Sequence, residues 1–198
     1  MTLFTFCLAL TLALQAPASA TPAAQANLIV MMETALGTIE IEVDVKRAPR
    51  TAANFLKYVD AGLYAGGRFH RVVRPETETR TDFPIQVIQA GINTARRSEG
   101  FPAVAMESTQ TTGILHKDGV VSMARAGVDT ARSDIFICIG DQPELDFGGK
   151  RNADGQGFAA FGRVVRGMDV VRKIQASPVQ PKTQTPDPPV AITAATRK

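Results

Sequence analysis

Residues 66–73 read Gly-Gly-Arg-Phe-His-Arg-Val-Val, a pair of glycines followed by a run with the period of a β-strand. Glycine pairs end helices and open turns, so the change of period after them marks the start of a new element. A polar loop follows at residues 74–84, and residues 85–91, Ile-Gln-Val-Ile-Gln-Ala-Gly, predict another strand. Gln89 lies between apolar neighbours there and needs a hydrogen-bond partner if it is buried, which makes it a candidate for a functional site.

The segments before this region predict a hairpin and a helix. Residues 28–32 and 38–43 are strand-like and flank a turn that contains Gly37, and the second run alternates apolar and acidic residues. A helix is predicted next, with Thr51 as its N-terminal cap and Gly62 as its C-terminal stop.

The segments after it predict more short strands. A Gly/Asp-rich loop is expected at residues 140–157, and the segment 178–189, rich in Pro, Gln and Thr, predicts extended chain. The remaining predicted elements are strands at 119–124, 135–139, 158–165 and 190–193 and a helix at 168–174. Many short strands with one early and one late helix predict a mainly β fold, a closed β-barrel capped by two α-helices.

The N-terminal residues 1–20 have the pattern of a secretory signal peptide. An almost wholly apolar run at 3–14 precedes a small-residue cleavage site, Ala-Ser-Ala at 18–20, although no Lys or Arg lies before the run. The alternative is a buried N-terminal helix; the run is too short to span a bilayer. The sequence therefore predicts a cleaved signal peptide, a flexible leader at 21–27 and one domain at 28–198, in a periplasmic or, as the alternative, secreted protein without a membrane segment.

Charge and cysteine content exclude several classes of protein. The net charge of +3 is weak and the basic residues are scattered, which argues against nucleic-acid binding. Signal cleavage would remove Cys7 and leave Cys138 as the single thiol, so no intramolecular disulfide can form. Neither histidine has a metal-ligand spacing, and residues 152–155 resemble a calcium loop only in part, because Lys150 and Phe161 occupy its first and last ligand positions. We expect no metal and no cofactor.

Six short blocks of sequence, in their order along the chain, carry a family resemblance. They are Thr51-Ala-Ala-Asn-Phe55, Gly66-Gly-Arg-Phe-His-Arg-Val-Val73, Val87-Ile-Gln-Ala-Gly91, Val121-Ser-Met-Ala-Arg-Ala126, Ser133-Asp-Ile-Phe-Ile-Cys138 and Phe161-Gly-Arg-Val-Val-Arg-Gly-Met-Asp-Val-Val171. The set resembles the cyclophilin family of peptidyl-prolyl cis/trans isomerases, and its Met-Ala-Arg segment resembles the bacterial exported branch. The resemblance covers about residues 28–195.

The resemblance implies an eight-stranded antiparallel barrel whose active groove lies on the outer wall. It also implies catalysis without metal, cofactor or covalent intermediate, with Arg71 at the catalytic position. Rotation about an X–Pro bond crosses a barrier of about 18–20 kcal/mol set by amide resonance. A permanently charged, planar guanidinium near the prolyl nitrogen can hydrogen-bond the lone pair that twisting exposes. The alternative for Arg71 is an ordinary surface arginine on a strand.

Further family positions predict a substrate groove around Arg71. Gln89 matches the residue that hydrogen-bonds the substrate backbone and steadies the arginine, and Phe136 matches a wall of the proline pocket. Strand alternation sends Phe136 to the face opposite Ile135 and Ile137, although core burial is its alternative. The other predicted substrate-binding residues are Leu145, Ala124, Arg125, Gln86, Val87 and Phe158.

Several positions in or near this groove are less certain or depart from the best-known family members. The Arg125 side chain is expected at the substrate edge or simply solvated, and His70 is expected on the strand face opposite Arg71, in a structural role. Gln86 and Val87 stand where the best-known members carry Phe and Met, a change that should weaken proline binding by about 1–3 kcal/mol. We also expect poor binding of cyclosporin.

The sequence thus predicts a peptidyl-prolyl isomerase that assists the folding of exported proteins. Its expected partners are proline-containing unfolded or extended polypeptides, and we expect a monomer. The first alternative is a proline-peptide-binding chaperone on the same fold with little or no catalysis, which Gln86 and Val87 favour and Arg71 opposes. The second is a small-ligand-carrying barrel, which would need an open lumen.

Overall fold

The computed structural model describes residues 28–198, so the predicted signal peptide and leader lie outside the described residues. The described chain begins with the predicted hairpin of β1 (Leu28–Thr34) and β2 (Gly37–Val43), whose register pairs Thr34 with Gly37. Gly37 has a φ of 132°, a conformation that residues with a side chain rarely adopt. The tight hairpin therefore needs glycine at this position.

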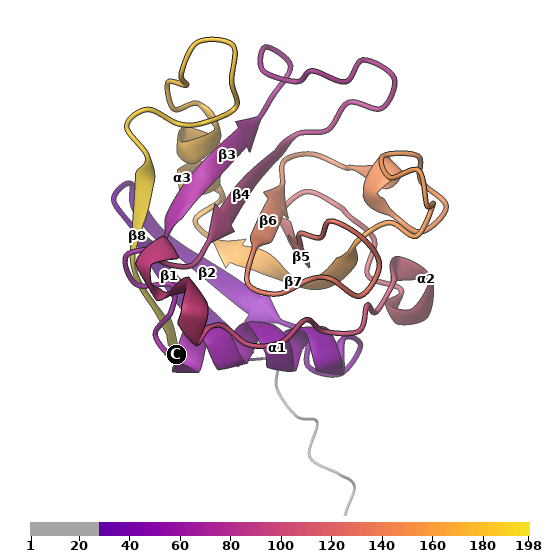
Figure 1. The fold of residues 1–198 in the computed structure, drawn as a ribbon, viewed down its shortest axis with the longest axis horizontal. Helices are drawn as coiled ribbons and strands as arrows, with labels where there is room; N and C mark the ends of the chain where they lie inside the picture. Colours follow the sequence, from indigo (N-terminus) through magenta and orange to yellow (C-terminus); the bar gives the residue numbers. More distant parts are fainter. Residues whose placement is uncertain (1–27) are drawn as a thin grey trace, which may run out of the picture.

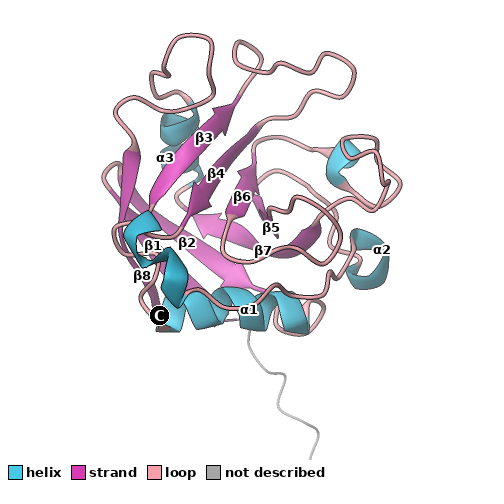
Figure 2. Ribbon diagram, in the orientation of Figure 1, coloured by secondary structure: helices cyan, strands magenta, loops and turns pink. Residues whose placement is uncertain are grey.

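Eight antiparallel strands close into a barrel, as the sequence predicted (Figures 1 and 2). Around the barrel the order is β1-β2-β7-β5-β6-β4-β3-β8, and β8 pairs with β1 to complete the circle. Closure leaves no long unpaired strand edge. The other strands are β3 (Arg68–Val73), β4 (Val87–Gly91), β5 (Val120–Met123), β6 (Ile135–Cys138), β7 (Ala159–Arg166) and β8 (Val190–Arg197).

The inside of the barrel is filled by apolar side chains. Alternate residues of each strand point inward, and Ile39 and Ile41 of β2 and Ile135 and Ile137 of β6 are fully buried there. Each such side chain contributes about 1.5–3 kcal/mol through burial. A packed interior leaves no open lumen, which contradicts the alternative of a small-ligand-carrying barrel.

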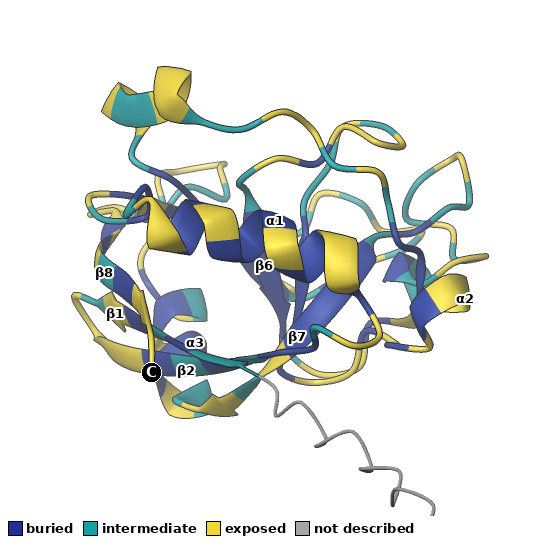
Figure 3. Ribbon diagram, turned by 90° about the horizontal axis from the view of Figure 1, so that it is seen from below, coloured by how far each residue is buried: buried dark blue, intermediate teal, exposed yellow. Residues whose placement is uncertain are grey.

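Two helices cover the barrel. Figure 3 shows α1 (Pro49–Asp60) lying across it, with buried and exposed residues alternating along the helix. The ring of Phe55 in α1 packs against Phe161 of β7, with ring centroids 5.0 Å apart. The late helix, α3 (Met168–Gln175), contacts β2, β3 and β4 and buries an apolar face of its own. Both are the helices predicted to cap the barrel.

A distant acidic residue, rather than Thr51, caps α1, so the predicted cap is wrong. Thr51 lies inside the helix and is fully buried. Its backbone N–H and its hydroxyl both donate to Glu107 Oε2, at 2.8 and 2.7 Å, and the N–H of Arg50 donates to the other carboxylate oxygen at 3.3 Å. A carboxylate at a helix N-terminus satisfies free N–H groups and complements the helix dipole.

Two segments differ from the sequence prediction. Between β4 and β5 the chain forms a 3-10 helix (Thr94–Glu99) and a one-turn helix, α2 (Thr109–Thr112), neither of which was predicted. The segment 178–189 was predicted to be extended but loops back on itself, because the N–H of Gln180 donates to the carbonyl of Thr185 at 3.0 Å. This loop lies beside β3 and reaches the site described below.

Candidate functional site

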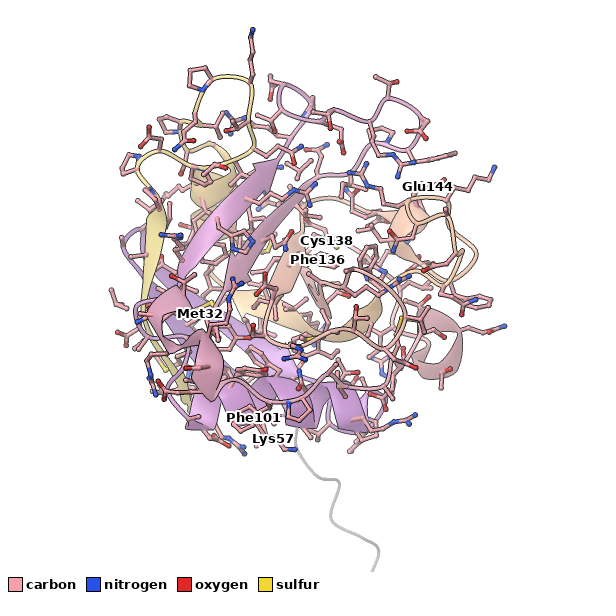
Figure 4. The ribbon with its side chains drawn as sticks, in the orientation of Figure 1. Met32, Lys57, Phe101, Phe136, Cys138 and Glu144 are labelled. Carbon is pink, nitrogen blue, oxygen red and sulfur yellow. The ribbon has the colours of Figure 1, made fainter. Side chains whose placement is uncertain are left out.

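A second apolar cluster lies outside the barrel core, on the outer wall that carries β4 and β6. The register of these strands pairs Val87 with Cys138 and Gln89 with Phe136. In Figure 4, Phe136 and Cys138 lie close together on β6. The buried members of this outer cluster are Val73, Ile85, Val87, Phe136, Cys138 and Leu145, with Ala124 and Phe158 packed against them. The structure thus brings five of the predicted site residues into one patch.

Strand alternation explains which residues reach the outer cluster. Phe136 belongs to it while its Ile neighbours fill the barrel core, as the sequence predicted. Gln86, just before β4, is half-buried and is not a member of the outer cluster, although Ile85 and Val87 on either side of it are. Its N–H donates to Gln142 Oε1 at 3.1 Å. Ile85 was missed, although its two-residue spacing from Val87 was a signal for the same face.

Arg71 lies on β3 directly opposite Gln89, at the edge of this cluster. Its Nη1 donates to Gln89 Oε1 at 3.3 Å, and its Nε donates to Gln184 Oε1 at 2.7 Å. Burial lowers the pKa of the Arg71 guanidinium, Arg151 lowers it further and Glu78 opposes this, but an arginine is not deprotonated in a protein. A half-buried cation therefore stands beside the outer apolar cluster, held by two uncharged amide groups.

The prediction that His70 faces away from Arg71 is wrong, because β3 carries a bulge. The register shifts between Phe69 and Arg71, which makes His70 the extra residue of the pair with β4. His70 therefore lies on the outer side and lines the same cavity as Gln89. Burial lowers the pKa of His70 although the carboxylate of Asp134, 3.7 Å away, opposes the shift.

Of the two readings of the Arg125 side chain, the solvated one is wrong, because that side chain is 2% exposed. Its terminal nitrogens donate to both carboxylate oxygens of Asp154, at 2.7 and 2.8 Å, and its Nε donates to the carbonyl of Gly157 at 2.8 Å. The hydrogen bond from Arg125 is the main cause that lowers the pKa of Asp154 to about 2. The guanidinium carbon lies 5.2 Å from the centre of the Phe158 ring. Arg125 thus ties the loop at 140–157 to the wall of the pocket.

A buried histidine supports Phe136 from behind. The rings of His116 and Phe136 are stacked, with centroids 5.8 Å apart and an interplanar angle of 15°. His116 Nδ1 lies 2.7 Å from Asp146 Oδ1, and its Nε2 lies 3.0 Å from the Ser122 hydroxyl. Ser122 is fully buried, so this set has no access to a substrate and cannot act as a hydrolytic triad. The sequence blocks gave no signal for His116.

A buried ion pair joins the two long loops beside Arg71. Arg151 donates to Glu78 Oε2 at 2.9 Å, and the two side chains are 10% and 5% exposed. Burial by itself raises the pKa of Glu78, but hydrogen bonds from the N–H groups of Arg80 and Ile85 and from Arg151 outweigh it and lower the pKa. Glu78 therefore forms its ion pair with Arg151 and not with Arg71.

A cavity of about 700 Å³ adjoins the groove on the side of Gln89 and Ala124. Arg68, Arg97 and Arg132 line it and give it a basic character. Within residues 28–198 the structure has no group of three or more His, Cys, Asp or Glu side chains that could hold a metal ion. None of the helices in the same part of the chain is long and apolar enough to cross a membrane.

Comparison with known proteins gives a consistent result. Residues 29–197 match the family described as cyclophilin type peptidyl-prolyl cis-trans isomerase/CLD. The chain is 33% identical over 177 residues to the peptidyl-prolyl cis-trans isomerase A of Dickeya dadantii, which covers 87% of this chain and 86% of that protein. It is 36% identical over 156 residues to the peptidyl-prolyl cis-trans isomerase of Acinetobacter baylyi, covering 78% of this chain and 76% of that protein.

Solved structures agree on the fold. A cyclophilin type peptidyl-prolyl cis-trans isomerase of Cryptosporidium parvum superposes with a TM-score of 0.68 at 19% identity, covering 87% of this chain and 98% of that one. The same protein, crystallised in the presence of the dipeptide Ala-Pro, gives a TM-score of 0.67.

Proposed function

Since the chain belongs to the cyclophilin type peptidyl-prolyl cis-trans isomerases, its activity is rotation about X–Pro peptide bonds, and we propose that this rotation takes place at Arg71. The observation that carries the assignment is the position of the Arg71 guanidinium at the edge of the outer apolar cluster, held by Gln89 and Gln184. A cation in a fixed position can stabilise the prolyl nitrogen as the amide twists. The apolar cluster beside it can bind the proline ring.

One part of the groove binds the proline ring and another acts on the prolyl nitrogen. The proline ring docks on the outer cluster, with Phe136, Val87 and Leu145 beneath it. Its three ring methylenes supply about 2 kcal/mol of binding through burial. Arg71 donates a hydrogen bond to the prolyl nitrogen as that atom becomes pyramidal. This bond forms only in the twisted state, so it lowers the barrier rather than merely tightening binding.

Neighbouring residues hold the substrate backbone. The Gln89 side-chain amide faces Arg71 and can hydrogen-bond the substrate backbone next to the proline. Ala124, just after β5, can meet an extended peptide through its backbone carbonyl, because its N–H already donates to the carbonyl of Asp134 at 2.8 Å. The sequence predicted that Arg125 binds substrate, but its side chain is paired with Asp154. We place it behind the pocket wall, as a support for Phe158.

The rate of cis/trans exchange in a short X–Pro peptide tests the function. A chaperone without catalysis would bind the peptide but leave its exchange rate at the uncatalysed value. Gln86 and Val87 stand where the best-known family members carry Phe and Met, so we expect catalysis with modest affinity. Magnetisation exchange by NMR measures both quantities in one sample.

The setting of this activity is a further part of the proposal. We propose that the protein belongs to the bacterial exported branch and assists the folding of exported proteins in the periplasm, as a monomer. The support is the signal-like sequence of residues 1–20. Mass spectrometry of protein from the cell envelope tests it: a mature N-terminus at Thr21 is expected, and an intact Met1 on cytoplasmic protein would refute export.

A further inference from the structure

We propose that Gln184 is a positioning residue for Arg71, holding the guanidinium in the orientation in which it meets the prolyl nitrogen. The inference rests on the proposed function, because it gives Gln184 a part in the same reaction. Gln184 lies 113 residues from Arg71 along the chain, in the loop at 178–189, and belongs to none of the six sequence blocks.

Both the oxygen and the nitrogen of the Gln184 side-chain amide form hydrogen bonds. Its Oε1 accepts the hydrogen bond from Arg71 Nε at 2.7 Å, and its Nε2 donates to the carbonyl of Thr77 at 2.8 Å. An amide that donates at one end and accepts at the other has a fixed rotation about its last bond. The oxygen therefore faces Arg71 and cannot exchange places with the nitrogen without losing both bonds.

The backbone of Gln184 is fixed as well. The N–H of Val72, next to Arg71 on β3, donates to the carbonyl of Gln184 at 2.7 Å. The loop is also held near its start, where Arg74 donates to the carbonyl of Ser177 at 3.0 Å. These backbone hydrogen bonds hold the loop that carries Gln184 against the chain of β3, which carries Arg71. They therefore fix the position of Gln184 relative to Arg71.

The bond to Gln184 leaves the charge of Arg71 free for the reaction. Nε is bound by Gln184 and Nη1 by Gln89, and both partners are neutral. A carboxylate at either place would pair with the guanidinium and reduce its attraction for the nitrogen lone pair. The nearby carboxylate of Glu78 is bound by Arg151 instead. Within residues 28–198 the arrangement orients the guanidinium and keeps its remaining N–H groups for a substrate.

The test compares Gln184→Ala with Gln180→Ala as the matched control. Gln180 is an exposed glutamine of the same loop that takes part through its backbone. NMR line-shape analysis of an X–Pro peptide yields the dissociation constant and the exchange rate on the enzyme separately. Gln184→Ala should lower that rate about 10- to 100-fold, as expected when a reacting group loses its alignment. The dissociation constant should change less than about twofold, because the apolar pocket is intact.

Two further measurements separate positioning from a loss of folding. In the parent protein, the Arg71 Nε–H should exchange slowly with solvent, and in Gln184→Ala it should exchange fast while the barrel amides stay protected. In an Arg71→Ala background, Gln184→Ala should reduce the residual rate no further. If Gln184→Ala does not fold, the exchange of Arg71 Nε–H in the parent protein decides alone, and fast exchange there contradicts the inference.

The outcomes also distinguish this inference from the proposed function. A parent protein that does not accelerate exchange overturns the function itself. An active parent whose Arg71→Ala variant is inactive, but whose folded Gln184→Ala variant matches the Gln180→Ala control, overturns only the role of Gln184.

Discussion

Arg125 covers the ring of Phe158 while both of its terminal nitrogens hold Asp154. The guanidinium carbon is 5.2 Å from the ring centre, and the two donor distances to the carboxylate are 2.7 and 2.8 Å. A planar, bidentate pair of this kind has a fixed geometry, so the loop that carries Asp154 is held against the pocket wall. The pocket is therefore supported by charge as well as by apolar packing.

This pair predicts a specific response to acid. The pKa of Asp154 is about 2 in the folded protein against 3.8 ordinarily, so the carboxylate stabilises the fold above about pH 4, and this stabilisation is lost as the pH falls toward 2. Asp154→Asn should therefore lose less stability than the parent between these two pH values. Urea unfolding across that range measures it, and parallel curves for the two proteins would contradict the role of the pair.

The stacking of His116 on Phe136 predicts a loss of both stability and rate. His116→Ala leaves the buried Ser122 hydroxyl and an oxygen of Asp146 without this partner, and it opens a space behind Phe136. We expect a loss of about 2–4 kcal/mol in the free energy of unfolding. We also expect a lower kcat/KM. Lys117→Ala, at an exposed neighbouring position, is the control. Equal stability of the two variants would contradict the role of His116 in supporting Phe136.

The packing of Val87 predicts the effect of a larger side chain there. Val87 is 2% exposed and lies against Cys138 and Leu145, so the extra bulk of Val87→Met has no free space to fill. We expect a loss of about 1–3 kcal/mol of stability from overpacking, without a gain in rate. Val165→Met, at an exposed position of β7, is the control. A stable variant with a raised kcat/KM would show that the pocket has room for a larger side chain.

The charge states in the groove predict a flat pH profile. Arg71 stays protonated, and the pKa of His70 is lowered from 6.5 by burial, so neither group changes its charge between about pH 7 and about pH 9. The kcat of the parent should be constant over this range. A bell-shaped profile centred there would indicate an acid or base that the account does not contain.

Local sequence patterns predicted most of the fold. The alternation of β6 placed Phe136 outside and its Ile neighbours inside, because a two-residue period is a property of the strand alone. The glycine of the first hairpin and both capping helices were predicted for similar local reasons. The bulge at His70 was not, since it depends on the register with β4 and not on the residues of β3.

The interactions that the sequence missed are all between distant segments. Thr51 is bonded by Glu107, 56 residues away, and Arg125 by Asp154, 29 residues away. Gln184, in the Pro-rich loop, holds Arg71. The family resemblance predicted the residues that line the groove. The residues that support them come from distant segments, so only the folded structure identifies them.

The most direct test of the account is the exchange rate of an X–Pro peptide with Arg71→Ala. Loss of a donor that acts only on the twisted amide should raise the barrier by about 2–4 kcal/mol, which lowers the rate by roughly one and a half to three decades. Arg71→Lys should recover little, because an ammonium lacks the planar fork. Circular dichroism should show a folded barrel in both variants. A folded Arg71→Ala protein that matched the rate of the parent would contradict the central claim.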